Sequence, residues 1–440
     1  MLSAAEAVTV GHELMAIHEA EDEMLEQVHA YWRGDQPLPI PPNGVPVDVR
    51  RLAQMSRVNM CKLVIDVLAQ SLFVDGFRQP RTADNAPVWE AWQANKLDAS
   101  QTGVHRAALA YGTSYTVVSA GDPHAVIRGL SPRKLTALYD EDDDTWPVFA
   151  LECRKSHEYR IYDDEAVYLL SRDKDAPKPE GAEHGLRFSG ASPHDFGVTP
   201  VVRFRNTMDC DGEHLGEISD LVPLQNQLDL TTFELLVAQH FQSFRQRYVL
   251  GWTSDDEATT AKAAASRLWT FDDPDVKVGE FGEVDLGGYL DSRAATIENL
   301  ATISQTPPHH VLGKLVNLSA EALAAAEAGQ RRKIDERKTL FGESWEQTLA
   351  LVAIAEGLAF DDGSQVVWRD TEARALASTV DALGKMVQML GLPPEVVWER
   401  IPGFTQQDVE TAKALAASSD SIGQLTALLD RQAQPVTPAA

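Results

Sequence analysis

The stretch QTPPHHVLGKLVNLSAEAL, residues 305–323, places two prolines and two adjacent histidines between an apolar-periodic segment and a long alanine-rich one. Pro307 and Pro308 cannot lie inside an α-helix, and each disfavours the helical conformation of the residue before it. The helix that we expect over about 286–304 must therefore end near Gln305. The stretch predicts a break between two helices.

The residues after the prolines predict the other end of that break. Gly313 permits a tight or left-handed turn, and Ser319 is suited to cap a helix whose first turn contains Glu321. The helix expected over 319–356 would be about 55 Å long at a rise of about 1.5 Å per residue, longer than one compact domain usually needs. Long helices joined by a shaped loop gain most when copies of the chain pack side by side around an axis.

His309 and His310 raise the question of a metal or catalytic site. Neighbouring residues on a helix point about 100° apart, and on a strand they point to opposite faces, so such a pair needs a third ligand nearby to hold one ion. The nearest candidates, Asp291, Glu298 and Glu321, have no recognised ligand spacing. We therefore expect no metal and no cofactor, and we interpret the stretch as a hinge with projecting polar side chains.

Composition excludes several classes of protein. The formal net charge of −27 over 440 residues argues against tight wrapping of nucleic acid, because phosphate binding needs clustered Lys and Arg. An acidic surface suits a channel through which DNA moves better than a site that binds DNA tightly. No apolar run approaches the roughly 18 residues that span a bilayer and no leader opens the chain, so we expect no membrane partner. We expect Cys61, Cys153 and Cys210 to pack as small apolar residues, since their spacing suits neither a disulfide framework nor a zinc knuckle.

Common catalytic signatures are absent from the sequence. It contains no Gly-x-x-x-x-Gly-Lys-Ser/Thr, no Gly-x-Gly-x-x-Gly after a strand, no Gly-x-Ser-x-Gly and no His-Glu-x-x-His. The acidic run 140–144 lacks the glycine and the distal glutamate of an EF-hand loop, and Trp146 and Pro147 follow it instead. We expect a solvated hairpin tip there, and no enzyme.

The pattern along the chain predicts an α+β fold in which helices come first, short strands second and long helices third. Helices are expected over about 4–33, 46–73, 87–110, 218–247, 286–304, 319–356, 371–390, 393–400 and 405–430, the last with Thr405 and Asp408 at capping positions. Short strands are expected at YTVVSA, AVIRGL, LTALY, VFALECR, EYRIY, AVYLL and VVRF, and a β-like patch at QVVWRD. A small mixed α/β insertion is expected over about 250–285.

Several pieces of sequence occur in an order that is more informative than any one of them. They are YWRGDQPLP, RVNMCKLVIDVLAQSLFVDGF, ALAYGTSYTVV, LSPRKLTALYDEDDDTWPVFAL, GVTPVVRFRN, LGEISDLVPLQNQLDLTTFELL and PPHHVLGKLVNLSAEAL. In this order, over nearly the whole chain, they resemble a bacteriophage portal protein of the siphovirus type. The sequence departs from the family pattern at two places, and these bear on the subfamily more than on the family. Asp229 stands where the family often has Asn, and residues 216–219 read Gly-Glu-Ile-Ser where the family has a Gly-Glu-Ser-like segment.

The resemblance implies a portal fold, a mainly helical α+β architecture with a β-rich wing, long stem helices, a small α/β clip and a helical crown. The implied parts are a wing at 1–210, stem helices at 211–247 and 286–305, a clip at 248–285, a tunnel loop at 306–318, a long wing helix and return at 319–369, a crown at 370–430 and a flexible tail at 431–440.

The resemblance also implies a function and a set of partners. Family members form rings, usually of twelve subunits, at one capsid vertex of the virion, after assembly in the host cytoplasm. Double-stranded DNA passes through the ring without sequence preference, during packaging by a terminase and during ejection. The other implied partners are a head–tail adaptor and the major capsid and scaffolding proteins.

Two groups of residues are candidates for contacts in such a ring. In the tunnel loop, His309, His310, Lys314 and Asn317 are expected to touch DNA, or else only to shape the loop. In the clip, Trp252, Trp269 and Phe271 are candidates for binding the adaptor, or else form the small core of the insertion.

Two other classes of protein stay open at this point. A metal-dependent enzyme that uses His309 and His310 would bind metal and lose activity on chelation. A helical adaptor or scaffold without a channel would form no ring. Both classes fit the charge and the cysteine count.

Overall fold

The computed structural model describes most of the chain. The described residues are 1–41, 44, 47–79, 86–155, 157–180, 182, 184–212, 214–243, 247–250, 277–280, 285–312, 320–369, 376–398, 401, 408–409 and 411–416. The chain divides into two compact units. Unit 1 comprises Met1–His29, Ile65–Ser219 and Ala328–Ala440, and unit 2 comprises Ala30–Val64 and Asp220–Glu327.

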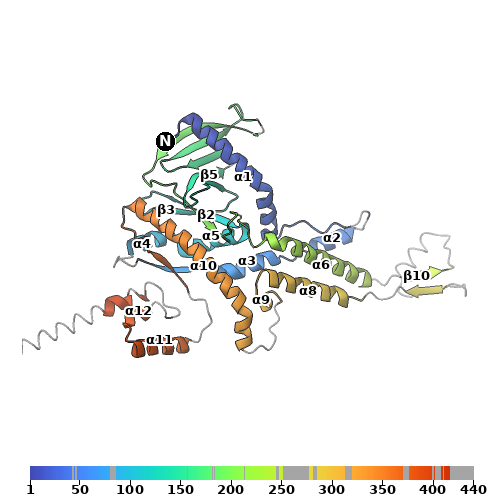
Figure 1. Ribbon diagram of the computed structural model, residues 1–440. Helices are drawn as coiled ribbons and strands as arrows, with labels where there is room; N and C mark the ends of the chain where they lie inside the picture. Colours follow the sequence, from blue (N-terminus) through green and yellow to red (C-terminus); the bar gives the residue numbers. More distant parts are fainter. Residues whose placement is uncertain are drawn as a thin grey trace, which may run out of the picture. The chain divides into compact units, whose positions relative to one another are not determined.

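Helices and strands both contribute to the fold, as the α+β prediction requires (Figure 1). The helices are α1 (Ala4–Arg33), α2 (Val47–Met55), α3 (Met60–Gln70), α4 (Ala86–Ala94), α5 (Leu97–Tyr111), the 3-10 turn η1 (Ser219–Leu221), α6 (Val222–Ser243), α8 (Gly287–Ile303), α9 (Pro308–Leu312), α10 (Ala320–Glu356), α11 (Leu376–Leu390) and α12 (Pro394–Trp398). The strands are β1 (Val74–Arg78), β2 (Thr113–Ser119), β3 (Val126–Leu130), β4 (Leu135–Tyr139), β5 (Pro147–Lys155), β6 (Glu158–Tyr162), β7 (Ala166–Asp173), β8 (Gly185–Pro193), β9 (Val201–Arg205), β10 (Arg247–Leu250), β11 (Lys277–Glu280) and β12 (Gln365–Trp368).

The predictions of α1, α8 and α10 are confirmed to within two residues at each described end. The single helix predicted over 46–73 is wrong, because α2 and α3 are separate. Asn59 starts the second of them: its Oδ1 accepts a hydrogen bond of 2.9 Å from the backbone N–H of Lys62, the arrangement of a helix N-cap.

The single helix predicted over 87–110 is also wrong, and α4 and α5 replace it. Lys96 has φ of 54° and so cannot continue a right-handed helix. The side chain of Asn95 donates to the carbonyl of Ala125 at 2.7 Å and accepts from the N–H of Ile127 at 2.8 Å. These two bonds tie the break between the helices to the start of β3.

All the predicted strands are present, and three further strands, β1, β8 and β10, were missed. The helix predicted over 218–247 ends earlier, since α6 stops at Ser243 and β10 begins at Arg247. β8 reads GLRFSGASP, which contains two glycines and a proline and therefore has a weak strand signal. It forms the edge of a five-stranded antiparallel sheet of order β4-β5-β6-β7-β8. The N-terminal part of α1 packs on this sheet, where Ala7 and Leu14 meet a cluster of strand residues, namely Leu151, Ile161, Ala166, Tyr168, Leu170 and Leu186 (Figure 1).

A second core of unit 1 is aromatic. Trp345 and Phe341 of α10 are fully buried, and both lie against Phe204 of β9, with ring centroids 4.9 Å and 6.1 Å away. His105 of α5 is also fully buried; its Nε2 accepts a hydrogen bond of 2.8 Å from the indole N–H of Trp345. Its Nδ1 therefore donates to the carbonyl of Leu72, and burial lowers the pKa of His105 to about 3. The imidazole is a neutral part of the core.

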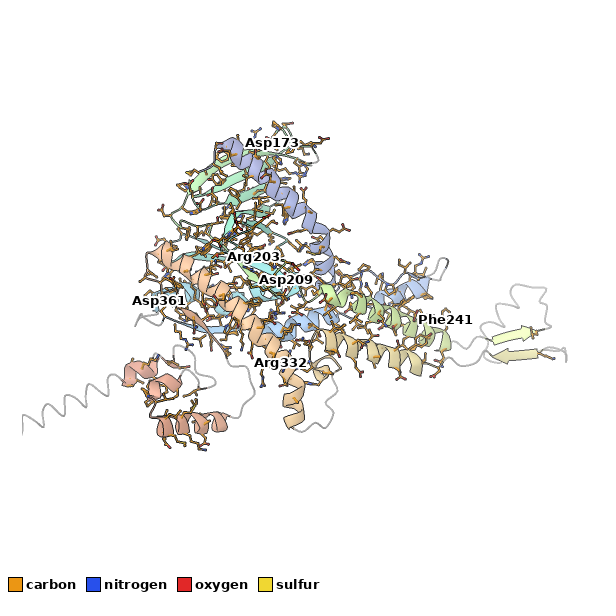
Figure 2. All side chains as sticks on the ribbon, viewed as in Figure 1. Asp173, Arg203, Asp209, Phe241, Arg332 and Asp361 are labelled. Atoms are coloured by element: carbon orange, nitrogen blue, oxygen red, sulfur yellow. The ribbon has the colours of Figure 1, made fainter. Side chains whose placement is uncertain are left out.

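The acidic run 140–144 connects β4 to β5, and the prediction of a hairpin tip is confirmed. Asp144 is not only solvated, because its carboxylate forms ion pairs with Arg203 at 3.0 Å and with Arg205 at 2.7 Å. The guanidinium of Arg203, which Figure 2 labels, also lies over the Tyr139 ring, 3.7 Å from its centroid.

The three cysteines are free and differ in exposure. Cys61 is buried and Cys153 is partly buried, and burial raises the pKa of both thiols to about 12. Cys210 is exposed, so the prediction that it packs as an apolar residue is wrong.

Unit 2 is built on α6 and α8, which lie side by side (Figure 1). The chain leaves α6 through β10 and returns to α8 through β11, and the two strands form an antiparallel pair. Pro223 occupies the second position of α6, where the missing N–H costs no hydrogen bond. No helix among the described residues combines the length and the apolar character needed to cross a membrane.

The break after α5 gives a prediction on stability. Gly112 has φ of 94°, and a Cβ there would lie 1.9 Å from the backbone oxygen of His214. Gly112→Ala should destabilise the chain by more than about 2 kcal/mol, since the left-handed conformation alone costs about 1–2 kcal/mol. Gly103 lies inside α5, and a Cβ there meets nothing within 4 Å, so Gly103→Ala should stabilise the chain by about 0.5–1 kcal/mol. Thermal unfolding of the two variants would contradict the structure if both shifted the transition in the same direction.

Candidate functional site

The residues predicted to form a site are described only in part. Lys314 and Asn317, and the clip candidates Trp252, Trp269 and Phe271, lie outside the described residues. The predicted cap Ser319 and the predicted Thr405 cap also lie outside them. His309 and His310 are described, and the candidate site is therefore built from these two side chains.

The histidines lie on a short helix rather than in an irregular loop. The expectation of a loop throughout 306–318 is wrong at α9, Pro308–Leu312. Pro308 is the first residue of this helix, where a proline is tolerated because its missing N–H would have no intrahelical partner. The N–H of His310 donates to the carbonyl of Pro307 at 3.0 Å.

The end of α8 sets the direction in which the chain enters α9. Gln305 has φ of 55°, a left-handed conformation that stops the helix as the prolines predict. The N–H of Thr306 returns to the carbonyl of Ala301 at 2.9 Å, and the hydroxyl of Ser304 donates to that of Thr306 at 3.0 Å. Buried polar groups at this helix end are thus hydrogen-bonded.

One apolar residue anchors α9 to the rest of unit 2. Val311 is 8 % exposed and packs with Leu228 of α6 and with Ile297 and Ala301 of α8. Val58, Met60 and Leu63, which are partly buried, complete this cluster. Because Val311 is held on this side, the two preceding histidines are left to project elsewhere.

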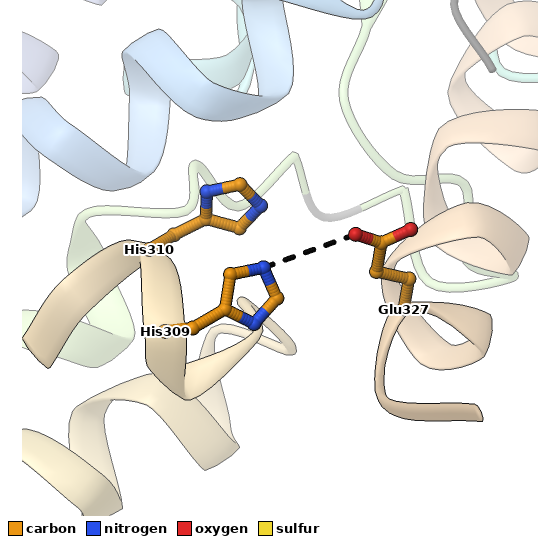
Figure 3. Close-up of side chains that lie close together, drawn as sticks. All are labelled: His309, His310 and Glu327. Atoms are coloured by element: carbon orange, nitrogen blue, oxygen red, sulfur yellow. Dashed lines mark ion pairs between the residues drawn. The ribbon is translucent and has the colours of Figure 1, made fainter. Parts of the chain in front are cut away.

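His309 and His310 face a carboxylate on α10 (Figure 3). His309 Nε2 lies 3.8 Å from Glu327 Oε1, and the two imidazole rings have centroids 4.3 Å apart with a 38° tilt. One ligand atom of each of the three residues lies within 4.8 Å of the others. The expectation that no third ligand lies near the histidine pair is therefore wrong.

The surroundings of His310 favour the neutral form of its imidazole. Burial lowers the pKa of His310, the positive charge that His309 can carry lowers it further, and Glu327 opposes both effects. The side chain of His309 is 14 % exposed and that of Glu327 is 37 % exposed. A neutral imidazole has a free nitrogen lone pair that can accept a hydrogen bond or bind a metal.

A second polar group, which sequence reasoning did not identify as a site, lies inside unit 2. Asp229 of α6 is 1 % exposed. Its carboxylate accepts hydrogen bonds from Gln36 Nε2 at 2.9 Å, the backbone N–H of Val58 at 3.0 Å and Gln225 Nε2 at 3.0 Å. Gln225 also accepts from the N–H of Met60 at 3.1 Å. Burial raises the pKa of Asp229 although each of these hydrogen bonds lowers it.

This network attaches the segment before α3 to α6. Asp229 and Gln225 are four residues apart and so lie on the same face of the helix. This face of α6 therefore has a polar centre, beside the buried apolar residue Leu228. The one signal of this in the sequence is Asp229 itself, at a position where the resembling family often has Asn.

The chain matches known proteins over most of its length. Residues 12–424 match the family described as phage portal protein, SPP1 Gp6-like. A portal protein of Mycobacterium phage D29 is 25% identical over 408 residues, covering 85% of this chain and 81% of the relative. A portal protein of Mycobacterium phage L5 is 25% identical over 379 residues, covering 78% and 76%.

Two solved structures resemble the chain more loosely. One is a virion of a native gene transfer agent particle, with a TM-score of 0.46, 12% identity and coverage of 81% of this chain and 97% of that chain. The other is the neck of an empty gene transfer agent particle, with a TM-score of 0.44, 13% identity and coverage of 81% and 96%.

One unit of the chain is built on the helix pair α6 and α8, and the other contains the three-stranded and five-stranded sheets. The family match spans nearly the whole chain, and the chain belongs to the phage portal protein family. Its function is that of a portal protein, and this family is a structural one.

The buried carboxylate gives a prediction on pH dependence. Because the pKa of Asp229 is raised in the folded state, folding favours the protonated form, so its contribution to stability falls as pH rises above its unfolded value of about 3.9. Asp229→Asn is neutral at every pH. The stability of this variant relative to the parent should therefore increase from about pH 4 to about pH 8.

Thermal or denaturant unfolding across that pH range measures the difference. Asp291→Asn, at an exposed position of α8, is the matched control and should show no such trend. Parallel stability curves for Asp229→Asn and the parent would show that the carboxylate is not strained by burial.

Proposed function

We propose that this chain is the repeating subunit of a closed ring at one capsid vertex, and that double-stranded DNA passes through the ring during packaging and ejection. The family match over residues 12–424 supports this proposal. Twelve subunits is the expected number, and the virion is the expected location.

The helix pair of unit 2 supports assembly into a ring. Leu230 and Phe241 on α6 are 47% and 40% exposed, and Leu290 and Ile303 on α8 are each 53% exposed. Phe241 lies near the end of α6 that leads to β10 (Figure 2). Apolar side chains spaced along a helix pair gain free energy when a neighbouring copy covers them.

The proposed parts of the ring follow the expected boundaries. The wing is 1–210 and the stem is α6 with α8, within 211–247 and 286–305. The clip is 248–285, to which β10 and β11 contribute, and the tunnel loop is 306–318. The wing helix and return are 319–369, the crown is 370–430 with α11 and α12, and the tail is 431–440.

The charge of the chain supports a passage rather than a binding groove. Each subunit carries a formal net charge of −27, so a wall made of many subunits repels phosphate and lets DNA slide. The tunnel loop supplies the exceptions, namely Lys314 and the polar side chains His309, His310 and Asn317. Contacts of these groups with the DNA backbone would be independent of sequence.

The proposed partners act at different parts of the ring. A terminase docks during packaging, and a head–tail adaptor binds the clip afterwards, with Trp252, Trp269 and Phe271 as its candidate contacts. Aromatic residues are enriched where protein interfaces concentrate their binding energy. The major capsid and scaffolding proteins surround the vertex.

The exposed apolar residues of the stem give a prediction on assembly. The double variant Leu230→Lys with Leu290→Lys should shift the protein from rings to monomers, since each half-exposed leucine that a neighbour buries contributes about 0.7–1.5 kcal/mol, half the value for a fully exposed one. Electron microscopy of negatively stained particles and size-exclusion chromatography measure the ring fraction. Val126→Lys, on the 42% exposed Val126 of β3, is the control and should leave rings intact. Rings with a central hole that persist in the stem variant would contradict packing through these residues.

The tunnel loop gives a prediction on packaging. Lys314→Glu replaces the proposed phosphate contact by a repelling charge in every subunit and should lower the DNA content of filled capsids several-fold while rings still form. Lys314→Arg keeps the positive charge and should package normally. DNA per particle, measured in capsids assembled with each variant, decides the question; normal filling with Lys314→Glu would refute the contact.

A further inference from the structure

The three side chains at α9 and α10 converge without a direct hydrogen bond between them. The shortest separation, 3.8 Å between His309 Nε2 and Glu327 Oε1, is an ion-pair distance and longer than a hydrogen bond. Within the part of the chain that the structure describes, this is the one group of three or more His, Cys, Asp or Glu residues with the spacing of metal ligands.

The separations are close to those of a metal centre. In a tetrahedral zinc site, Zn–N and Zn–O distances of about 2.0–2.2 Å place neighbouring ligand atoms about 3.3 Å apart. The three ligand atoms here lie within 4.8 Å of one another. His310 is exposed and Glu327 is partly exposed, so both side chains have room to change rotamer as the ligand atoms come closer.

The short helix α9, which carries both histidines, is held in place by other contacts. Val311 fixes α9 in the cluster with Leu228 and Ile297. The left-handed Gln305 and the following prolines set the direction of α9. Adjacent histidines on an ordinary helix point about 100° apart, but on this short helix their ring centroids lie only 4.3 Å from each other.

The donor set selects a class of ion. Two imidazole nitrogens and one carboxylate oxygen suit zinc and the neighbouring first-row divalent metals, whereas calcium and magnesium prefer oxygen ligands alone. One coordination position remains for water. Glu327 would balance part of the charge of the bound ion.

We propose that His309, His310 and Glu327 bind one zinc ion per subunit. Binding takes place within a single chain and does not depend on the ring or on DNA. The ion links α9 to α10. It thereby cross-links the two ends of the segment between His310 and Glu327, which includes the tunnel-loop residue Lys314. With their ligand nitrogens occupied, the histidines would position the tunnel loop instead of contacting DNA themselves, and Lys314 and Asn317 would remain as the proposed DNA contacts.

Cobalt(II) is a suitable probe, because four-coordinate Co²⁺ with nitrogen and oxygen ligands absorbs visible light and zinc displaces it. The untagged full chain, stripped of metal and titrated with Co²⁺, should develop this absorption with one equivalent per subunit. Zinc should abolish the absorption and raise the melting temperature of the chain. Both signals should be lost in His309→Ala with His310→Ala, and Glu327→Gln should weaken cobalt binding at least tenfold.

Two variants of the same chemical type serve as controls. His157→Ala and Glu298→Gln, at exposed positions outside the cluster, should bind Co²⁺ as the parent does. Ring formation and the far-ultraviolet circular dichroism spectrum show that each variant is folded. Visible absorption that survives in the double histidine variant, or a parent chain that develops none, would overturn the proposal, whatever the outcome of the ring and packaging experiments.

Discussion

Unit 2 depends on one buried carboxylate. Asp229 accepts three hydrogen bonds, from Gln36, Val58 and Gln225, and so attaches the segment before α3 to the middle of α6. Leu228, its neighbour in sequence, belongs to the apolar cluster that receives α8 and α9. A buried charge is tolerated only where such bonds replace its hydration. α9 joins the same cluster through Val311, next to His310 in sequence.

Much of the fold could be predicted from local sequence signals. Pro307 and Pro308 correctly predict the end of α8, and period-two segments correctly predict the strands between β2 and β7. The errors arise where a tertiary contact overrides a continuous helical pattern. Asn95, for example, bonds to Ala125 and to Ile127 of β3, and no feature of its own neighbourhood shows these distant partners. Likewise β8 becomes a strand because β7 offers an edge to pair with.

The candidate site could be predicted only in part. Adjacent histidines are visible in the sequence, but their third neighbour, Glu327, follows His310 by 17 residues and faces it only because α10 begins where it does. Spacing rules assume ligands on one element or on a known motif, whereas here two helices supply them. The polar centre of α6 was missed for a related reason: Gln225 and Asp229 are stabilised by Gln36 and Val58, which are distant in sequence.

The differing exposure of the three cysteines has a practical consequence for a ring of identical subunits. Thiolates, not thiols, react with alkylating reagents, and Cys61 and Cys153 are protected by burial and by their raised pKa values. Cys210 is exposed and offers one reactive thiol per chain. A fluorescent dye attached there would appear once in every subunit, and counting the dyes on a single particle would count the subunits of the ring directly.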